Sequence, residues 1–154
     1  MINLIPIGIT IKTAAADDTP AITKLFAQQL KEHRIEFQED VLRTAIKTVI
    51  ADDRLGFILV AKKGTESIGV AYISFTWSLE HGGKSAWLEE LYVLPEWRKQ
   101  GIGTAMLTKI VEIVPLHDCA ALDLEIDQEH QLAANLYLRH GFQPLSRNRW
   151  VKFL

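Results

Sequence analysis

A glycine-containing turn, Arg98–Thr104, has the residue types and spacing best suited to holding an anion. It follows an apolar run, Leu88–Val93, that predicts a strand, and it leads into a helical pattern that begins near Ile102. The first backbone amides of a helix lack intrahelical partners, and the helix dipole is positive at that end. Glycine at 101 and 103 would let a phosphate approach the backbone closely. Arg98 and Lys99 add positive charge, and Thr104 adds a hydroxyl.

Two better-known phosphate-binding turns do not fit this spacing. A P-loop ends in Gly-Lys-Ser/Thr, whereas Gly103 is followed by Thr104 and Ala105. A dinucleotide fingerprint needs a third glycine three residues after the second, where this chain has Met106. A plain strand-to-helix connection would also explain the turn, so alone it indicates an anion site without naming the ligand.

The elements around this turn predict an α/β domain of the α+β type. The apolar periodicity predicts about seven strands in a mixed, mostly antiparallel twisted sheet, flanked by about four helices. The strands are expected at 7–12, 57–62, 67–77, 85–94, 120–126, 142–145 and 150–154, the last two as a hairpin. The helices are expected at 17–30, 38–50, 102–114 and 128–140.

Composition indicates one soluble domain over residues 1–154. Hydrophobic residues make up 48% of the chain, charged residues 23%, and the net charge is −2, which indicates no nucleic-acid partner. No apolar run approaches the ~20 residues that span a membrane, and residues 1–11 do not resemble a signal peptide. A single cysteine, Cys119, fits a reducing compartment, so we expect a cytoplasmic protein. The histidines show no metal-ligand spacing.

Two blocks carry a family resemblance. Residues 87–104, which read Leu-Tyr-Val, a proline and then Arg-x-x-Gly-x-Gly, closely resemble the acetyl-coenzyme A motif of the GNAT superfamily of N-acetyltransferases. Residues 133–142 resemble a second block of the same family, at the expected distance. The loop before Leu88 and the run Leu-Glu-Glu-Leu-Tyr-Val are similar to the polyamine and thialysine acetyltransferase branch.

The resemblance implies a binding site for acetyl-coenzyme A as co-substrate, with no metal. The strand of residues 85–94 and the parallel strand that starts at Ala120 would splay apart, and the cofactor would enter the gap. Backbone amides of the turn would bind the pyrophosphate, and the main chain of the strand would pair with the pantetheine arm. The implied cofactor-binding residues are Leu91, Tyr92, Val93, Arg98, Lys99, Gln100, Gly101, Ile102, Gly103, Thr104, Asn135 and Tyr137.

One position departs from the family pattern. Many members carry a cofactor-binding asparagine seven residues before the tyrosine, and here that position is His130. Asn135 is the alternative source of that contact, and His130 is expected to be a surface residue of the first helical turn.

Transfer of an acetyl group to an amine needs a base, an oxyanion donor and an acid for the leaving thiolate. The family often places its base at Glu89, and Glu90 is the alternative; neighbouring strand residues face opposite sides, so one of the two would face a given cleft. Tyr137 is suited to protonate the thiolate, unless it is simply a core aromatic. Backbone amides at Leu91–Val93 would serve as the oxyanion donor.

We therefore expect an N-acetyltransferase that acts by direct attack in a ternary complex on a small primary amine. Glu32, Glu36, Glu80 and Glu89 would attract a cationic acceptor, or the helix-end charges are merely solvated. The alternatives are acetylation of a protein lysine or N-terminus, and a catalytically silent coenzyme A-binding module. A homodimer that joins the C-terminal segments, Trp150–Leu154, is also expected.

Overall fold

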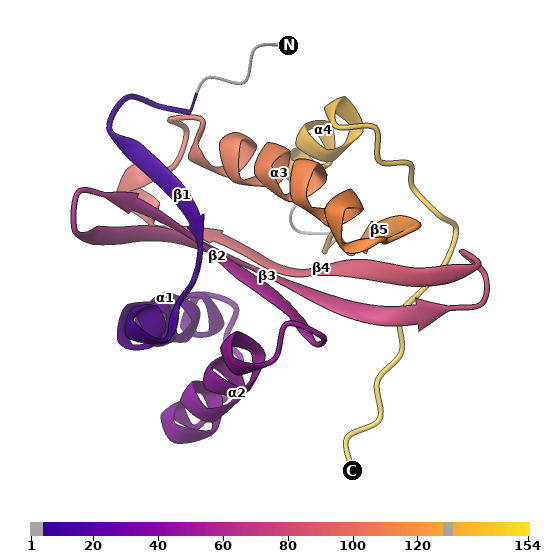
Figure 1. Ribbon diagram of the computed structural model, residues 1–154, viewed down its shortest axis with the longest axis horizontal. Coiled ribbons are helices and arrows are strands. Elements are labelled where there is room, and N and C mark those ends of the chain that lie inside the picture. The colour runs from indigo at the N-terminus through magenta and orange to yellow at the C-terminus, as the bar shows by residue number, and fades with distance from the viewer. Residues whose placement is uncertain (1–4, 128–130) are drawn as a thin grey trace.

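The computed structural model describes residues 5–127 and 131–154 and contains a twisted five-stranded sheet (Figure 1). The strands lie in sequence order, with the first four antiparallel to their neighbours and the last parallel to the fourth. They are β1 (Ile9–Thr13), β2 (Gly56–Lys63), β3 (Glu66–Ser78), β4 (Gly83–Val93) and β5 (Ala121–Leu124).

Four α-helices cover the two faces of this sheet. The helices α1 (Thr19–Glu32) and α2 (Glu39–Ala51) lie on one face, and α3 (Ile102–Ile113) and α4 (Gln131–Arg139) lie on the other (Figure 1). Pro20 occupies the first turn of α1, where a missing N–H costs no hydrogen bond. Because their caps and apolar stripes are local signals, the first three helices fall close to their predicted positions.

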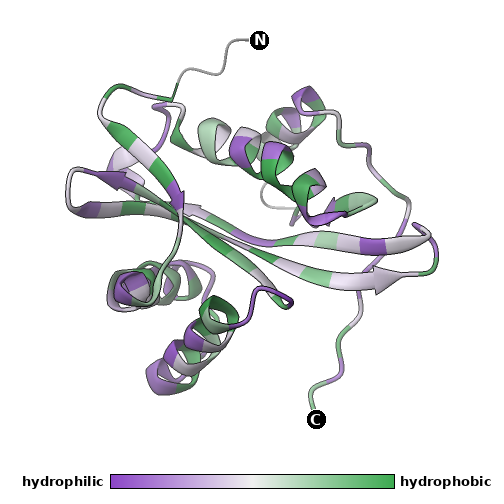
Figure 2. Cartoon of the chain, in the orientation of Figure 1, coloured by the Kyte–Doolittle hydropathy of each residue, from purple (hydrophilic) through white to green (hydrophobic). Residues whose placement is uncertain are grey.

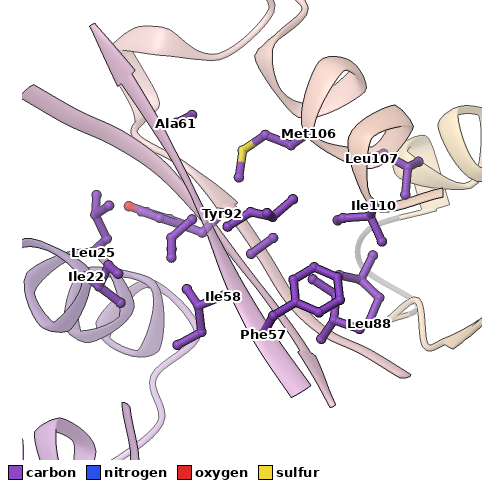
Figure 3. Packing of buried hydrophobic residues seen from close by; sticks show 14 of the residues in the cluster. Ile22, Leu25, Phe57, Ile58, Ala61, Leu88, Tyr92, Met106, Leu107 and Ile110 are labelled. Atoms are coloured by element: carbon purple, nitrogen blue, oxygen red, sulfur yellow. The ribbon is translucent and has the colours of Figure 1, made fainter. Parts of the chain in front are cut away.

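The core is built from both faces of β2, β3 and β4. Ile22 and Leu25 of α1 pack on one face, and Met106 and Ile110 of α3 pack on the other (Figure 3). Apolar residues accordingly run along the central strands (Figure 2). The sheet and α3 approach closely at Gly69, where an added Cβ would lie 3.1 Å from the Met106 sulfur.

The prediction of about seven strands is wrong for the described residues, which hold five. The segment after α4, predicted as a hairpin, forms no strand in the part of the chain that the structure describes. Pro144 lacks the N–H that a ladder needs, and a short apolar segment cannot become a strand without a partner edge. Exposed ion pairs contact this segment instead of a strand partner: Arg147 with Glu80, and Arg149 with Glu125.

Candidate active site

The pairing of the parallel strands β4 and β5 ends in the middle of β4, where β5 itself ends, so the structure does not show the expected splaying of two continuing strands. Their register runs from Ser85–Ala121 to Leu88–Leu124 and stops there, while β4 stays paired with β3 as far as Val93. The Leu94 amide donates to the Ile68 carbonyl on the β3 side, so strand alternation turns the main-chain groups of Leu91 and Val93 toward the opposite edge. Among the described residues no strand pairs with that edge, so its main-chain groups have no ladder partner there.

The glycine turn presents free amides at the start of α3. Gly101 caps the helix with φ +81°, a left-handed conformation that favours glycine. The first intrahelical bond runs from the Ala105 amide to the Gly101 carbonyl at 2.9 Å, so the amides of residues 102–104 precede the helical ladder. A Cβ added at Gly103 would meet nothing within 4 Å, so the surface there is open. This cradle fits a phosphate group.

Arg98, which leads into the turn, is engaged elsewhere. Its Nε donates to the Val93 carbonyl at 2.8 Å, and its Nη2 donates to Glu32 Oε2 at 2.8 Å. The guanidinium also lies 5.3 Å from the centre of the Tyr92 ring. The Tyr92 hydroxyl donates to the other oxygen of Glu32, and burial together with this carboxylate raises the pKa of Tyr92 to about 12.

A β-bulge at Glu89 changes which residues share a face of β4. Tyr72 pairs with Glu90 and Ile73 pairs with Leu88, so Glu89 is an extra residue with no register partner on β3. Leu88 therefore packs on the α3 side, whereas Glu90 faces α1.

The bulge places both glutamates on the α1 side of the sheet. Glu89 accepts a hydrogen bond of 2.6 Å from Ser74, which shares a face with Tyr72 and hence with Glu90. The expectation that only one glutamate could face a given cleft is wrong, because it assumed uninterrupted strand alternation. Trp87 is also on this side, whereas Leu91 and Val93 are not.

The two carboxylates differ in environment. Glu90 is half-buried and accepts a 2.6 Å hydrogen bond from Gln29 of α1, while Glu89 is exposed. Burial raises the pKa of Glu90; the Gln29 hydrogen bond opposes this, and the charges of Glu89 and Asp127 add to it. Of the two carboxylates, Glu90 is thus the one whose pKa is raised above its ordinary value.

Tyr137 lies on α4, the helix that follows β5 in the chain. It packs edge-on against Phe142, with 5.8 Å between the ring centres, and burial raises the pKa of its hydroxyl. Asn135 is exposed on the same helix. A hydrogen bond of 2.9 Å between Thr108 and His140 joins α3 to α4. The expectation for His130 lies outside the described residues.

A polar group beside the glutamates was not predicted from the sequence. Asp123 of β5 is the register partner of Trp87 and lies 2.8 Å from His81 Nε2. The buried Ser85 hydroxyl is 3.5 Å from the same carboxylate oxygen. The sequence offered one sign of this group, the acidic residue Asp123 between two leucines of the predicted strand. Of the other acidic residues proposed to attract an amine, Glu32 and Glu80 are paired with arginines, and Glu36 is exposed.

Comparison with known proteins fits this geometry. The model of the Acetyltransferase (GNAT) family matches residues 20–142. The chain belongs to this family. Over 83 residues this GNAT chain is 34% identical to thialysine N-epsilon-acetyltransferase of Mus musculus, a match that covers 53% of the chain and 46% of the relative. The chain therefore spans less than half the length of that relative. Aminoalkylphosphonate N-acetyltransferase of Salmonella typhimurium is 25% identical over 144 residues, which cover 94% of this chain and 90% of the relative.

Solved structures share the fold over almost the whole GNAT chain. An integron cassette protein from the mobile metagenome of Cole Harbour Salt Marsh aligns with a TM-score of 0.83 at 26% identity, covering 94% of this chain and 90% of the other. A predicted acetyltransferase with acetyl-CoA from Clostridium acetobutylicum aligns with a TM-score of 0.77 at 20% identity, covering 95% and 96%. Neither a metal-ligand cluster nor a helix able to cross a membrane occurs in residues 5–127 and 131–154.

Proposed function

We propose that the chain transfers the acetyl group of acetyl-coenzyme A to the primary amine of a small molecule. The observation that carries this proposal is the end of the β4–β5 pairing at Leu88, followed along the chain by the bulge with Glu89 and Glu90 and then by the glycine turn. Thialysine and aminoalkylphosphonate acetyltransferases among the relatives support a small amine as acceptor.

The cofactor would lie along the open edge of β4. The free amides of residues 102–104, the neighbouring backbone from Gln100, and Lys99 would hold the pyrophosphate. The main chain of Leu91, Tyr92 and Val93 would face the pantetheine arm, with hydrogen bonds from the groups of Leu91 and the Val93 amide. Asn135 and Tyr137 would meet the cofactor from α4. Bound acetyl-coenzyme A supplies the thioester that is attacked.

The acceptor amine would reach the gap from the α1 side. Glu90, the half-buried carboxylate, would take the ammonium proton directly or through water, since a base works best with a pKa near the working pH. Glu89 and Asp123 would add negative charge around the cation. The Leu91 amide would donate to the developing oxyanion, and Tyr137 would give its proton to the leaving sulfur.

Turnover of acetyl-coenzyme A against an amine panel tests the proposal. The panel includes diamines, thialysine, aminoalkylphosphonates, a lysine peptide and a free N-terminal peptide, with thiol release and product mass as readouts. We expect a small amine to react fastest. Faster reaction of a peptide would support the protein-acetylating alternative. Tight coenzyme A binding without turnover of any amine would support the silent module.

The Tyr137 role has its own test. Because the phenol would act in the chemical step, Tyr137→Phe should lower kcat by about 100-fold and leave the coenzyme A dissociation constant nearly unchanged. Phe142→Leu alters the ring that packs against Tyr137 while keeping the hydroxyl, and serves as the packing control. An unchanged kcat in Tyr137→Phe would remove Tyr137 from the reaction.

We also propose that the C-terminal segment mediates a homodimer. Trp150, Val151 and Phe153 are all exposed, and apolar side chains of this kind are usually covered in solution. Sedimentation of the full chain should give a dimer, and a chain that ends at Arg149 should be monomeric. A monomeric full chain would refute this.

A further inference from the structure

Arg98 is the first residue of the glycine turn, yet its guanidinium lies on the other side of the sheet from α3. Its Nη2 donates to Glu32 at the end of α1, and it lies against the ring of Tyr92, which extends toward α1 (Figure 3). The helices α1 and α3 cover opposite faces (Figure 1). The guanidinium of Arg98 therefore points toward α1, away from the amides at the start of α3 that would meet the pyrophosphate.

The charge of Arg98 is already matched within the protein. One oxygen of Glu32 accepts from the guanidinium and the other from the Tyr92 hydroxyl. Each oxygen of the Glu32 carboxylate therefore has a partner, and Glu32 and Arg98 form a local ion pair. The exposed ammonium of Lys99 and the backbone amides are the better sources of positive potential for a phosphate.

The Arg98 side chain also closes a loop in the main chain. Its Nε binds the Val93 carbonyl, so it spans the short 3₁₀ helix Pro95–Trp97 and ties the end of β4 to the beginning of the turn. Val93 is one of the residues whose main chain faces the open edge. Arg98 therefore donates to the last carbonyl of that edge, the one of Val93. The main-chain N–H and C=O of Leu91 and the N–H of Val93 remain for a ligand.

We propose that Arg98 is a positioning residue, held by Glu32, that fixes the turn and the open edge of β4 relative to α1 without contacting the pyrophosphate. This rests on the proposed acetyl-coenzyme A site and reassigns the role that the motif implied for this arginine. The fixed geometry acts equally on a donor with or without phosphates, and this distinguishes a positioning residue from a phosphate ligand.

A double-mutant cycle on coenzyme A affinity tests the Glu32 connection. Arg98→Met and Glu32→Gln should each weaken coenzyme A binding by about fivefold. The double variant should bind no more weakly than the weaker-binding single variant, because both substitutions remove the same Arg98–Glu32 ion pair. Calorimetry gives these constants without any turnover. Losses that multiply in the double variant would overturn the proposal. Arg54→Met, which removes an exposed pair with Asp52 on another loop, is the matched control.

A donor that lacks the pyrophosphate separates positioning from phosphate contact. Arg98→Met should lower kcat/KM for acetyl-coenzyme A and for S-acetylpantetheine by the same factor. Lys99→Met should impair acetyl-coenzyme A alone. If Arg98→Met spares S-acetylpantetheine, Arg98 is a phosphate ligand and the proposal fails. If no amine is acetylated, the proposed function fails, while the calorimetric cycle still decides the role of Arg98. Thermal midpoints of all variants confirm that they are folded.

Discussion

At the scale of single residues, the contact between Gln29, which lies outside the family motifs, and Glu90, which lies within the first of them, bears most directly on the proposed chemistry. Gln29 is buried on α1, its Nε2 donates to Glu90, and its Oε1 has no hydrogen-bond partner among the described residues. A buried amide oxygen without a hydrogen-bond partner is costly, and few such groups occur in a native structure. This donor favours the ionised form of Glu90 against burial and the nearby charges of Glu89 and Asp127.

Gln29→Met should therefore shift the pH dependence of acetyl transfer. Without the donor, the raised pKa of Glu90 rises further, so the carboxylate stays protonated to higher pH. Because a base must be ionised, the acidic limb of the kcat/KM profile should move to higher pH while the plateau changes little. Glu90→Gln, which has no titrating group at this position, should lose that limb. An acidic limb at the same pH in Gln29→Met would show that another group is the base.

At the scale of elements, local signals predicted the helices and all five observed strands, but not the bulge. The cap residues of α1, the glycine before α3 and the continuous apolar run of β2 are all local in sequence. The bulge is set by the register of β4 against β3, and the Arg98–Glu32 pair joins residues 66 apart, so neither leaves a mark in a short window. The exposed, mostly apolar segment at 150–154 was likewise predicted as a strand because the residue types in a short window say nothing about whether a partner edge exists.

Deleting Glu89 should preserve the fold and abolish activity. Removal of the extra residue leaves Ile73 paired with Leu88 and Tyr72 paired with Glu90, so every side chain keeps its face. The straightened strand should follow β5 further and narrow the gap. Glu89→Ala, which keeps the bulge, should retain most of the activity. Circular dichroism and kcat measure the two effects; a deletion variant as active as Glu89→Ala would show that the bulge is dispensable.

At the scale of the whole molecule, a buried charge cluster fastens the N-terminal strand to the sheet. Asp18, 5% exposed, binds Lys12 of β1, Lys62 of β2 and the Ala15 amide. Burial opposes the ionised form of Asp18, but these three donors outweigh it and hold its pKa well below the ordinary range. Such a cluster contributes stability above the unfolded-state pKa of about 3.9 and loses it as the pH falls through the folded-state pKa.

Asp18→Asn should destabilise the protein by about 3 kcal/mol at pH 7, because it leaves lysines without their partner in a partly buried position. The difference from wild type should shrink as the pH falls below about 4, where Asp18 of the unfolded chain begins to be protonated while the folded protein still holds the carboxylate ionised. Urea unfolding at pH 7 and pH 3 measures both values. Asp17→Asn, at an exposed neighbouring position, is the control. An equal difference at both pH values would contradict the role of the Asp18 charge.

The placement of α1 and α3 on opposite faces has a kinetic consequence for the proposed reaction. If the acceptor comes from the α1 side and the thioester from the side of α3 and α4, neither substrate stands in the entrance of the other. Binding should then follow no compulsory order, with initial-rate lines that intersect for both substrates. Each product should inhibit competitively against the substrate that shares its face. A bisubstrate inhibitor would need a linker that passes from one face of the sheet to the other, beside β4 and beyond Leu88, where its pairing with β5 ends.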